Sequence, residues 1–374
     1  MDISTFELER FFARHEFTAP YTLTSSDCEP LSLAAALDLA DDEGLALWDG
    51  LKLGYTEYAG SPILRREIAG LYEGIDPDLV HVAAPIESIF LAMNAMLEHG
   101  DHVVCTHPGY QALSELAVAL GCDVDKWEPV EERVWKFDVD RLSELVRPTT
   151  RAIIVNFPHN PTGYLPPLDD FLAVIEIARE CGAYLFSDEM YRYLEVDPST
   201  RLPAACERYD RAVSLSGMSK AFSMPGIRIG WLVTKDTKLL EKIAYLHDYT
   251  TICSSAPSEV LALIGLRAWE RIVADNLARL RRNLALLERF FSEHGDVFSC
   301  VKPIAGTVSF PRVFSGGGSG SFCRKVLEIT GVLLVPSEIF GYGDEHFRLG
   351  FGREDMPTVL ELLADYLNGR SRAG

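Results

Sequence analysis

Four short apolar runs, each followed within a few residues by a polar side chain, place the strongest constraint on the fold of this chain. They cover residues 102–106, 151–155, 183–187 and 212–215, and they have the length and composition of buried strands. A helical pattern precedes the third run, at 168–181. In an open α/β sheet, ligands bind beyond the carboxyl ends of the strands. We therefore expect one edge of such a sheet to gather four chemically different side chains: Tyr110, Asn160, Asp188 and Lys220.

The segment that follows the last run is the most specific. Residues 216–230 read SGMSKAFSMPGIRIG, with Lys220 just beyond the strand and Arg228 between Gly226 and Gly230. Glycine lets neighbouring backbone approach closely. An amine that can form a Schiff base, together with a guanidinium fork for a phosphate, is what pyridoxal phosphate requires of a protein. A lone Ser-x-x-Lys would be an ordinary surface sequence, whereas the whole string favours this cofactor.

The same string closely resembles the lysine signature of the class I/II aminotransferases, the fold-type-I, pyridoxal-phosphate-dependent enzymes that include aspartate aminotransferase. The resemblance covers roughly residues 50–352. It implies an α/β fold in which a large domain has a mostly parallel central sheet flanked by helices. The N- and C-terminal segments would form a smaller α+β domain. The expected division is an N-terminal segment at 1–45, a large cofactor-binding domain at 46–275 and a C-terminal small domain at 276–374.

The resemblance assigns roles around the ring of the cofactor. Lys220 would hold the cofactor as an internal aldimine and later act as the general base. Tyr110, after Pro108-Gly109, would stack on the ring. Asn160, in the turn N-P-T-G, and Tyr191 would bind the phenolic oxygen. Asp188 would stand against the ring nitrogen and keep it protonated, so that the ring withdraws electrons from the substrate.

At the phosphate end the chain departs from the family. The family binds the phosphate at the N-terminus of a helix, here predicted at 86–98. Pro85 stands where a donor is usual, and it has no N–H to give. A further tyrosine, in Tyr55-x-x-x-x-Gly60, matches one that reaches the phosphate of the other subunit. The expected phosphate-side residues are Ile86, Glu87, Ser219, Arg228 and, across the dimer, Tyr55.

On the substrate side, Arg348 matches the arginine that grips an α-carboxylate in a bidentate fork. Asn160 would support the same carboxylate. The family lines its substrate site with a glycine- and proline-containing segment where this chain has the polar residues 24–30. Ser26 and Asp27 are therefore candidate substrate contacts. The alternative is that one of them caps the helical stretch at 31–40.

The resemblance implies an enzyme that removes the Cα hydrogen of an L-α-amino acid and transfers its amino group to a 2-oxo acid. Elimination or cyclisation of a specialised amino acid, with an arginine-like one as a candidate, starts from the same chemistry, and a non-catalytic sensor is a further alternative. Acidic residues in the N-terminal segment would favour a cationic or hydroxylated side chain, unless they are helix caps and solvated faces. They are Glu7, Glu9, Asp27 and Glu29.

The composition limits the kinds of partner and compartment that we expect for this chain. The formal net charge of −20 argues against nucleic acid and anionic membranes. Eight scattered cysteines without a C-x-x-C pair suit reduced thiols rather than disulfides or a zinc site. The N-terminus lacks the pattern of a signal peptide, and no long run is free of charge. We expect a cytoplasmic enzyme without a metal site, and the resemblance implies a homodimer whose sites are shared through Tyr55 and residues 250–257.

Overall fold

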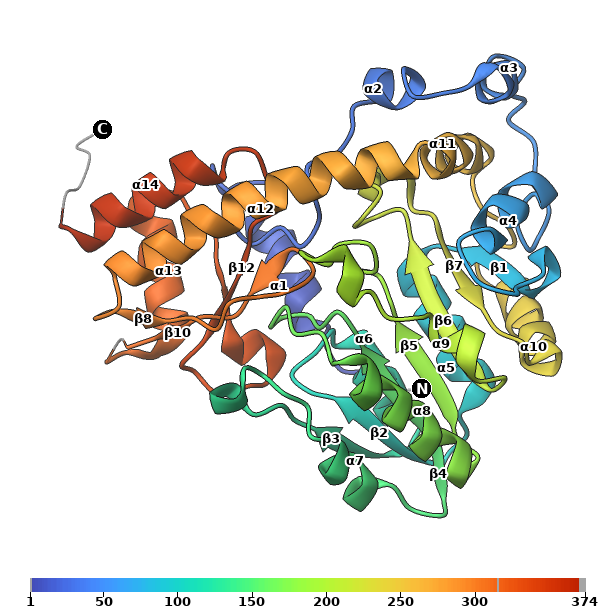
Figure 1. Ribbon diagram of the computed structural model, residues 1–374, viewed down its shortest axis with the longest axis horizontal. Helices are drawn as coiled ribbons and strands as arrows, with labels where there is room; N and C mark the ends of the chain where they lie inside the picture. Colours follow the sequence, from blue (N-terminus) through green and yellow to red (C-terminus); the bar gives the residue numbers. More distant parts are fainter. Residues whose placement is uncertain (1, 315, 370–374) are drawn as a thin grey trace.

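The structure is a computed structural model that describes residues 2–314 and 316–369 (Figure 1). Its centre is a seven-stranded sheet in the order β1-β7-β6-β5-β4-β2-β3. The strands β2 to β6 run parallel, and β7 is antiparallel to both of its neighbours. The four predicted strands are therefore confirmed as neighbours in one mostly parallel sheet. In chain order the strands are β1 (Val80–Ala83), β2 (His102–Thr106), β3 (Asp123–Trp127), β4 (Thr150–Asn156), β5 (Tyr184–Asp188), β6 (Ala212–Gly217) and β7 (Gly230–Val233).

Helices cover both faces of this sheet. Along β4, Ile153 and Val155 pack with α7 and α8, whereas Ala152 and Ile154 face α5, α6 and α10. Because both faces are buried, the strands read as unbroken apolar runs rather than as alternating ones. The helices of this part are α5 (Pro85–Met96), α6 (Ala112–Ala119), α7 (Val139–Leu145), α8 (Leu168–Cys181), α9 (Ala205–Arg208) and α10 (Thr237–His247), with the 3-10 turns η1 (Pro77–Leu79), η2 (Glu131–Arg133), η3 (Pro198–Thr200) and η4 (Pro225–Ile227).

A second, smaller α+β part is built by the two ends of the chain. Its strands form two short sheets, β10-β8 and β11-β12-β9. The N-terminal segment joins it through a bridge from Tyr21 to Val332 and a hydrogen bond of 2.8 Å from the Gly350 amide to the Leu23 carbonyl. The elements are β8 (Phe298–Ser299), β9 (Val308–Ser309), β10 (Arg312–Val313), α13 (Gly318–Thr330), β11 (Val335–Pro336), η5 (Ser337–Phe340), β12 (Phe347–Gly350) and α14 (Met356–Leu367).

The long helix α12 (Trp269–Glu293) runs from the large part to the small one (Figure 1). It follows α11 (Ala256–Arg267), against which α2 (Leu33–Leu37), α3 (Asp42–Asp49) and α4 (Pro62–Ala69) pack. The proposed domain boundary after residue 275 falls within α12, and the boundary after residue 45 falls within α3. The exact division stays a prediction. Within 2–314 and 316–369, no helix is long and apolar enough to cross a membrane.

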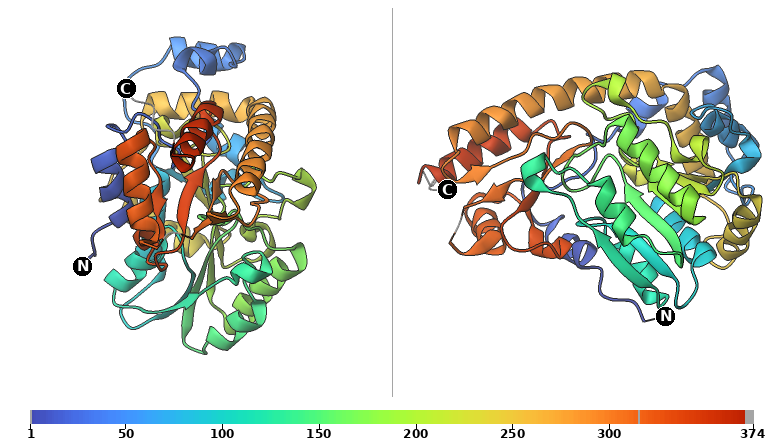
Figure 2. Two further views of the ribbon diagram at one scale, coloured as in Figure 1. Left: turned by 90° about the vertical axis from the view of Figure 1, so that its left-hand side faces the viewer. Right: turned by 60° about the horizontal axis from the view of Figure 1, so that its bottom comes forward.

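The N-terminal segment differs from expectation in one respect. The helical stretch predicted at 31–40 is shorter, as α2, and its cap is Ser32, whose Oγ accepts a 3.1 Å hydrogen bond from the Ala35 amide. The predicted alternative, a cap by Ser26 or Asp27, is therefore wrong. The helix α1 (Glu7–His15) packs beside η5 (Figure 2).

Candidate active site

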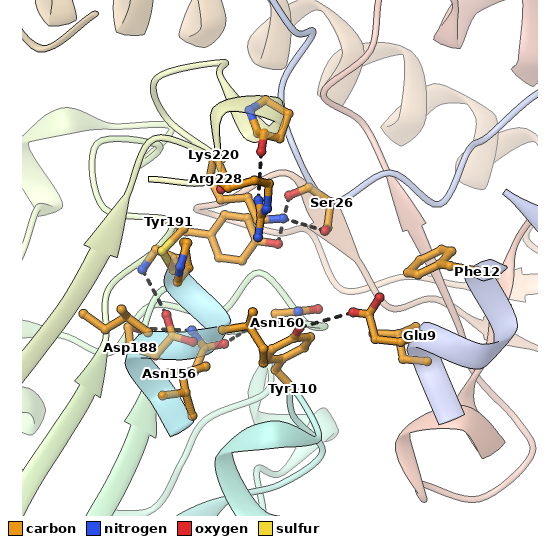
Figure 3. A pocket seen from close by; sticks show the side chains of 18 of the residues that line it. Glu9, Phe12, Ser26, Tyr110, Asn156, Asn160, Asp188, Tyr191, Lys220 and Arg228 are labelled. Carbon is orange, nitrogen blue, oxygen red and sulfur yellow. Dashed lines mark hydrogen bonds between the residues drawn. The ribbon is translucent and has the colours of Figure 1, made fainter. Parts of the chain in front are cut away.

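A cavity of about 200 Å³ lies where the carboxyl ends of β4, β5 and β6 meet the start of α5, the helix α1 and the strand β12 (Figure 3). The sheet edge, which the sequence predicts to be the ligand edge, thus faces the smaller part of the molecule. Most of the predicted site residues line this cavity: Ser26, Ile86, Tyr110, Asn160, Asp188, Tyr191, Ser219, Lys220, Arg228 and Arg348.

Lys220 reaches the cavity from the turn after β6. Its Nζ donates a 2.7 Å hydrogen bond to Ser26 Oγ and lies 5.7 Å from the centre of the Tyr191 ring. The Tyr191 hydroxyl in turn donates to the Ser26 carbonyl at 3.0 Å, and Thr307 Oγ1 donates to the same oxygen at 2.8 Å. The segment around Ser26 is therefore held over the lysine by residues from both parts of the chain.

Asp188 closes β5 and is a buried carboxylate, 5% exposed. Its Oδ1 accepts a 3.1 Å hydrogen bond from the Met190 amide. Burial raises the pKa of the Asp188 carboxyl to about 7, although the hydrogen bond and the positive charge of Lys220 both act to lower it. A cation held against this carboxylate would relieve the cost of its burial, and a protonated ring nitrogen is such a cation.

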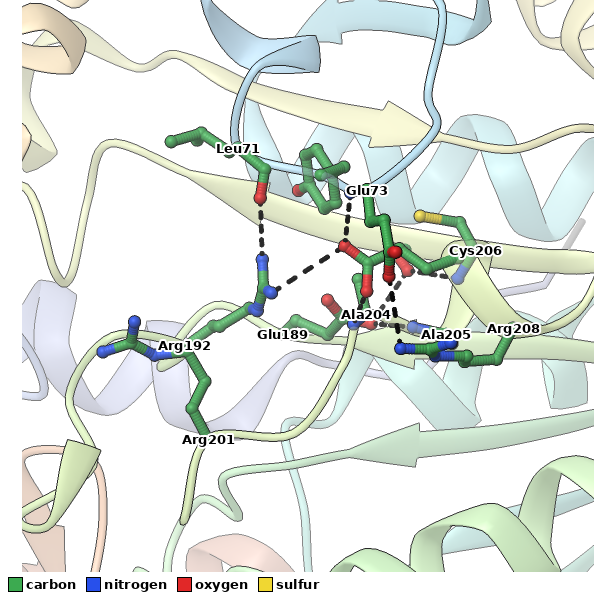
Figure 4. Close-up of polar contacts among 12 residues, drawn as sticks. Leu71, Glu73, Glu189, Arg192, Arg201, Ala204, Ala205, Cys206 and Arg208 are labelled. Carbon is green, nitrogen blue, oxygen red and sulfur yellow. Dashed lines mark hydrogen bonds and ion pairs between the residues drawn. The ribbon is translucent and has the colours of Figure 1, made fainter. Parts of the chain in front are cut away.

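The residue after Asp188 anchors the end of β5 from behind. Glu189 is buried, and its Oε1 accepts hydrogen bonds from the Ala205 amide at 2.9 Å and from Ser214 Oγ at 2.8 Å (Figure 4). Ser214 lies on the adjacent strand β6, and Ala205 begins α9. Because these contacts tie β5 to β6, they fix the separation between Asp188 and Lys220.

Arg348 enters the cavity from β12 and is 1% exposed. It donates through Nη1 to Asn160 Oδ1 at 3.2 Å and through Nη2 to the Thr24 carbonyl at 3.0 Å. Its Nε is buried without a hydrogen-bond partner among the described residues. A buried guanidinium with an unused donor is costly unless a ligand accepts from it. The group is therefore suited to an anion that enters the cavity.

Asn156 also lines the cavity, and the sequence analysis did not select it. Its Oδ1 accepts a 2.8 Å hydrogen bond from the Asn160 amide, and its Nδ2 donates to the Asp188 carbonyl at 3.1 Å. It therefore fixes two predicted site residues relative to each other. Its position in the sequence could have identified it, because a polar residue at the end of a buried strand needs hydrogen-bond partners.

On the phosphate side, Ser219 Oγ is buried and has no partner within the described part of the chain. Arg228 has a left-handed backbone conformation, with φ of 56°, and its Nη1 donates to the Pro225 carbonyl at 2.8 Å. Pro85 and Ile86 present the start of α5 to the same end of the cavity. A hydroxyl, a guanidinium and a helix N-terminus together suit a phosphate.

The glycines of the lysine segment have different roles from those expected. A Cβ on Gly230 would lie 2.8 Å from Pro85 Cγ and 2.9 Å from the Ser216 carbonyl oxygen, so Gly230 does permit a close approach. A Cβ on Gly226 would meet nothing within 4 Å. The expected close approach of backbone at Gly226 is therefore wrong, because the space beside its Cα is open. Gly217 has the role instead, since its Cβ would lie 2.8 Å from Gly230 Cα.

Three predicted site residues lie outside this cavity. The Asp27 carboxylate pairs with Arg353, with contacts of 3.0 and 3.2 Å, which directs it away from the expected substrate contact. The Glu87 carboxylate accepts hydrogen bonds from Thr251 Oγ1 at 2.8 and 3.0 Å, so only its backbone could serve a phosphate. Tyr55 is 89% exposed and does not line the cavity of its own chain.

The helix α1 supplies three residues to the wall of the cavity: Leu8, Glu9 and Phe12. Of these, the sequence pointed only to Glu9. The Tyr110 hydroxyl donates a 3.2 Å hydrogen bond to Glu9 Oε1, and the Phe12 ring centre lies 5.8 Å from the Arg348 guanidinium. The sequence marked Glu9 as one of several acidic residues near the substrate pocket, but no local pattern distinguishes it from Glu7.

A mostly parallel α/β sheet that gathers a lysine, a buried aspartate and two arginines at its carboxyl edge defines a fold-type-I enzyme of the pyridoxal-phosphate-dependent class. The model of the aminotransferase class I and II family matches residues 23–364. The chain therefore belongs to the aminotransferase class I and II family.

Individual relatives cover most of the chain. A PLP-dependent aminotransferase from Streptococcus suis 89-1591 has a similar structure, with a TM-score of 0.92, 31% identity and coverage of 100% of both chains. The solved PLP-dependent cyclase OrfR has a TM-score of 0.88 and 30% identity over 99% of this chain and 98% of its own. Capreomycidine synthase from Streptomyces vinaceus is 28% identical over 76% of this chain and 74% of the relative.

Proposed function

We propose that the chain binds pyridoxal phosphate at Lys220 and transfers the amino group of an L-α-amino acid to a 2-oxo acid. The observation that carries this proposal is a set of three buried polar groups in one cavity. The Ser219 hydroxyl and the Nε of Arg348 have no hydrogen-bond partner among the described residues, and burial raises the pKa of the Asp188 carboxyl to about 7. One cofactor with an amino acid beside it would satisfy all three.

Each residue has a distinct task in this proposal. When bound, pyridoxal phosphate supplies an electron sink for the bond that breaks at Cα. Lys220 holds the cofactor and then, as a free amine, takes the proton from Cα and returns it. Arg348 orients the substrate through its α-carboxylate. The charge of Asp188 keeps a proton on the ring nitrogen, and Asn160 with Tyr191 binds the phenolic oxygen.

Borohydride reduction followed by peptide mapping tests the attachment site. A stable pyridoxyl group is expected on Lys220, because reduction fixes a Schiff base as a secondary amine. Lys235 is the matched control and should carry no label. Its Nζ lies 3.8 Å from Asp210 on the surface, and the residue does not line the cavity. Label on another lysine, or no label at all, would overturn the proposal.

A second candidate function is cyclisation or elimination on a specialised amino acid, with an arginine-like one as a candidate. Two relatives favour it by name, capreomycidine synthase and the cyclase OrfR, at 28% and 30% identity. The two candidates share the steps up to removal of the Cα proton and differ in the product. Incubation with an amino-acid panel and an acceptor 2-oxo acid separates them. Conversion of the acceptor into a second amino acid without free ammonia supports transfer, whereas free ammonia together with a 2-oxo acid, or a cyclic amino acid, supports the alternative.

We also propose a cytoplasmic homodimer with sites shared between subunits. Thr56 Oγ1 donates a 3.1 Å hydrogen bond to the Ser254 carbonyl, so the Tyr55 segment and the 250–257 segment lie together. The large exposed side chains on these segments are Leu53, Tyr55, Tyr58, Tyr249 and Ile252. An apolar surface of this kind suits burial against a second subunit. All eight cysteines are free, which suits a reducing compartment.

A further inference from the structure

We infer that the cavity selects an L-α-amino acid with a positively charged side chain, and that Glu9 on α1 binds this charge. The inference rests on the proposed function, because it assumes that the cofactor and an α-carboxylate occupy the other charged groups. It names a determinant of specificity, Glu9, and a class of substrate, amino acids whose side chain ends in a guanidinium or an ammonium group.

The charged side chains that line the cavity support this inference first. The acidic and basic side chains that line it, among the described residues, are Glu9, Asp188, Lys220, Arg228 and Arg348. Arg228 is suited to the phosphate, Arg348 to the α-carboxylate, and Asp188 with Lys220 to the cofactor ring. Glu9 is the remaining charge. A substrate with a second carboxylate would find no further cation on this wall and would face Glu9.

The position of Glu9 in the cavity also supports the inference. It lies on the wall opposite Asp188 and Lys220, so a substrate held at Lys220 extends its side chain across the cavity towards α1 (Figure 3). The Tyr110 hydroxyl, on an aromatic residue expected against the ring, donates to Glu9 Oε1 at 3.2 Å. This hydrogen bond fixes the carboxylate. Within the described part of the chain no lysine or arginine forms an ion pair with it, although the Glu9 charge does act on Arg348, where it raises the pKa of the guanidinium against the effect of burial.

The surroundings of Glu9 are partly apolar. Leu8 and Phe12, from the same helix, also line the cavity. Apolar neighbours exclude water, and an ion pair is stronger where water is excluded. The Phe12 ring also lies over the Arg348 guanidinium, 5.8 Å from the ring centre. Glu9 and Phe12 of α1 therefore line the cavity together with Arg348 of β12, the group suited to the α-carboxylate.

A fourth observation is the negative charge around Glu9. Burial raises the pKa of the Glu16 carboxyl, and the negative charges of Asp27 and Glu9 raise it further. The Asp27 charge is offset by Arg353, at 3.0 Å, whereas Glu9 has no such partner among the described residues. A cationic side chain at Glu9 would lower the mutual repulsion of these groups. A neutral side chain would leave that repulsion in place, and an anionic one would increase it.

Glu9→Gln tests the inference, because it removes the charge and keeps an oxygen that can accept from Tyr110. Single-turnover spectra of the holoenzyme should be recorded with L-arginine and with L-citrulline, its uncharged isostere, and with L-lysine and L-aspartate. The wild type is expected to prefer L-arginine over L-citrulline by about ten- to a hundredfold in the ratio of single-turnover rate constant to dissociation constant, the range for a hydrogen bond to a charged group. Glu9→Gln should remove most of this preference.

Glu7→Gln is the matched control. Glu7 lies on the same helix, is exposed and does not line the cavity, so this variant changes the net charge equally. It should keep the preference for L-arginine. The inference is overturned if Glu9→Gln slows L-arginine and L-citrulline by the same factor, which would mark Glu9 as a purely structural partner of Tyr110. It is equally overturned if L-aspartate reacts fastest with the wild type.

The failure of this inference can be told apart from failure of the proposed function. Calorimetric titration of the borohydride-reduced holoenzyme with L-arginine and L-citrulline measures binding without turnover. If Lys220 carries no pyridoxyl label, the proposed function fails, whatever the titration gives. If Lys220 is labelled but L-arginine binds no more tightly than L-citrulline, only the assignment of Glu9 fails.

Discussion

Asp188 shows how a buried carboxylate can be costly to the protein alone and useful to the loaded enzyme. Its ordinary pKa of about 3.9 is raised to about 7 by burial. Around neutral pH, a large part of the population therefore holds a proton there until a cation arrives. Binding of a positively charged ring nitrogen would release that proton and stabilise the carboxylate.

Asp188→Asn should lower turnover and leave cofactor binding largely intact. Asparagine keeps the oxygen that accepts from the Met190 amide, but it cannot stabilise a charged ring nitrogen. We expect kcat to fall by about a hundred- to a thousandfold, the range for loss of one preorganised electrostatic group. Cofactor affinity is measured by titration and turnover with a reactive amino acid. Near-normal turnover would contradict the assignment, and Asp210→Asn, on the exposed surface, is the control.

The same substitution should stabilise the protein without cofactor in a pH-dependent way. Because the folded pKa of Asp188 lies above the unfolded value, the native state binds more protons between pH 4 and 7, so wild-type stability falls as the pH rises through this window. Asparagine does not titrate. Asp188→Asn should therefore gain stability relative to the wild type between pH 5 and 8, by at most about 4 kcal/mol at about 1.4 kcal/mol per pKa unit. Urea unfolding at the two pH values measures this, and an equal difference at both would refute it.

At the scale of elements, two glycines on neighbouring strands allow the start of α5 to lie close to the sheet. Gly217 on β6 and Gly230 on β7 face each other in the register of the sheet, and both leave room for Pro85. The N-terminus of α5 can then approach the sheet edge closely. Because the phosphate site is expected at this N-terminus, the two glycines position it without touching a ligand.

Gly230→Ala should therefore destabilise the fold and weaken cofactor binding together. The new Cβ would lie 2.8 Å from Pro85 Cγ and 2.9 Å from a backbone oxygen, and overpacking of this kind costs about 1–3 kcal/mol. Gly226→Ala, four residues earlier, meets nothing within 4 Å and should change stability by less than about 1 kcal/mol. Urea unfolding and cofactor titration of both variants check the pair. Equal effects would show that close packing at Pro85 is not the cause.

Element by element, the sequence was informative where structure is local and silent where it is not. The strands could be predicted because helices bury both of their faces, which leaves unbroken apolar runs such as 151–155. The residues that follow the strands could be predicted because the edge of a parallel sheet gathers them. The docking of α1 could not, since Glu9 meets Tyr110 across 101 positions. Likewise, Asp27 is directed to Arg353 by a contact across 326 positions.

At the scale of the whole molecule, the start of α5 is linked to the surface segment that we propose meets a second copy of the chain. Glu87, near the start of α5, accepts a hydrogen bond from Thr251, and the adjoining segment holds Tyr249, which is 91% exposed. Thr251 is held from a second side, because its Oγ1 lies 3.0 Å from His247 Nε2. His247 in turn contacts the buried His81 at 2.9 Å through its other ring nitrogen. The segment that is expected to reach the partner is therefore joined to the helix that is expected to hold the phosphate.

A mixing experiment tests whether Tyr55 completes the site of the other subunit. Lys220→Ala and Tyr55→Phe should each be nearly inactive or impaired in cofactor binding as pure dimers. After dissociation and reassociation, half of the dimers are mixed, and each mixed dimer has one site with Lys220 from one chain and Tyr55 from the other. Activity should recover to about a quarter of the wild-type value, as expected for a two-fold dimer with shared sites. Tyr245→Phe, also an exposed tyrosine, should by itself remain active. If Tyr55 served its own chain, mixed dimers would gain nothing, and a stable, active monomer would exclude sharing altogether.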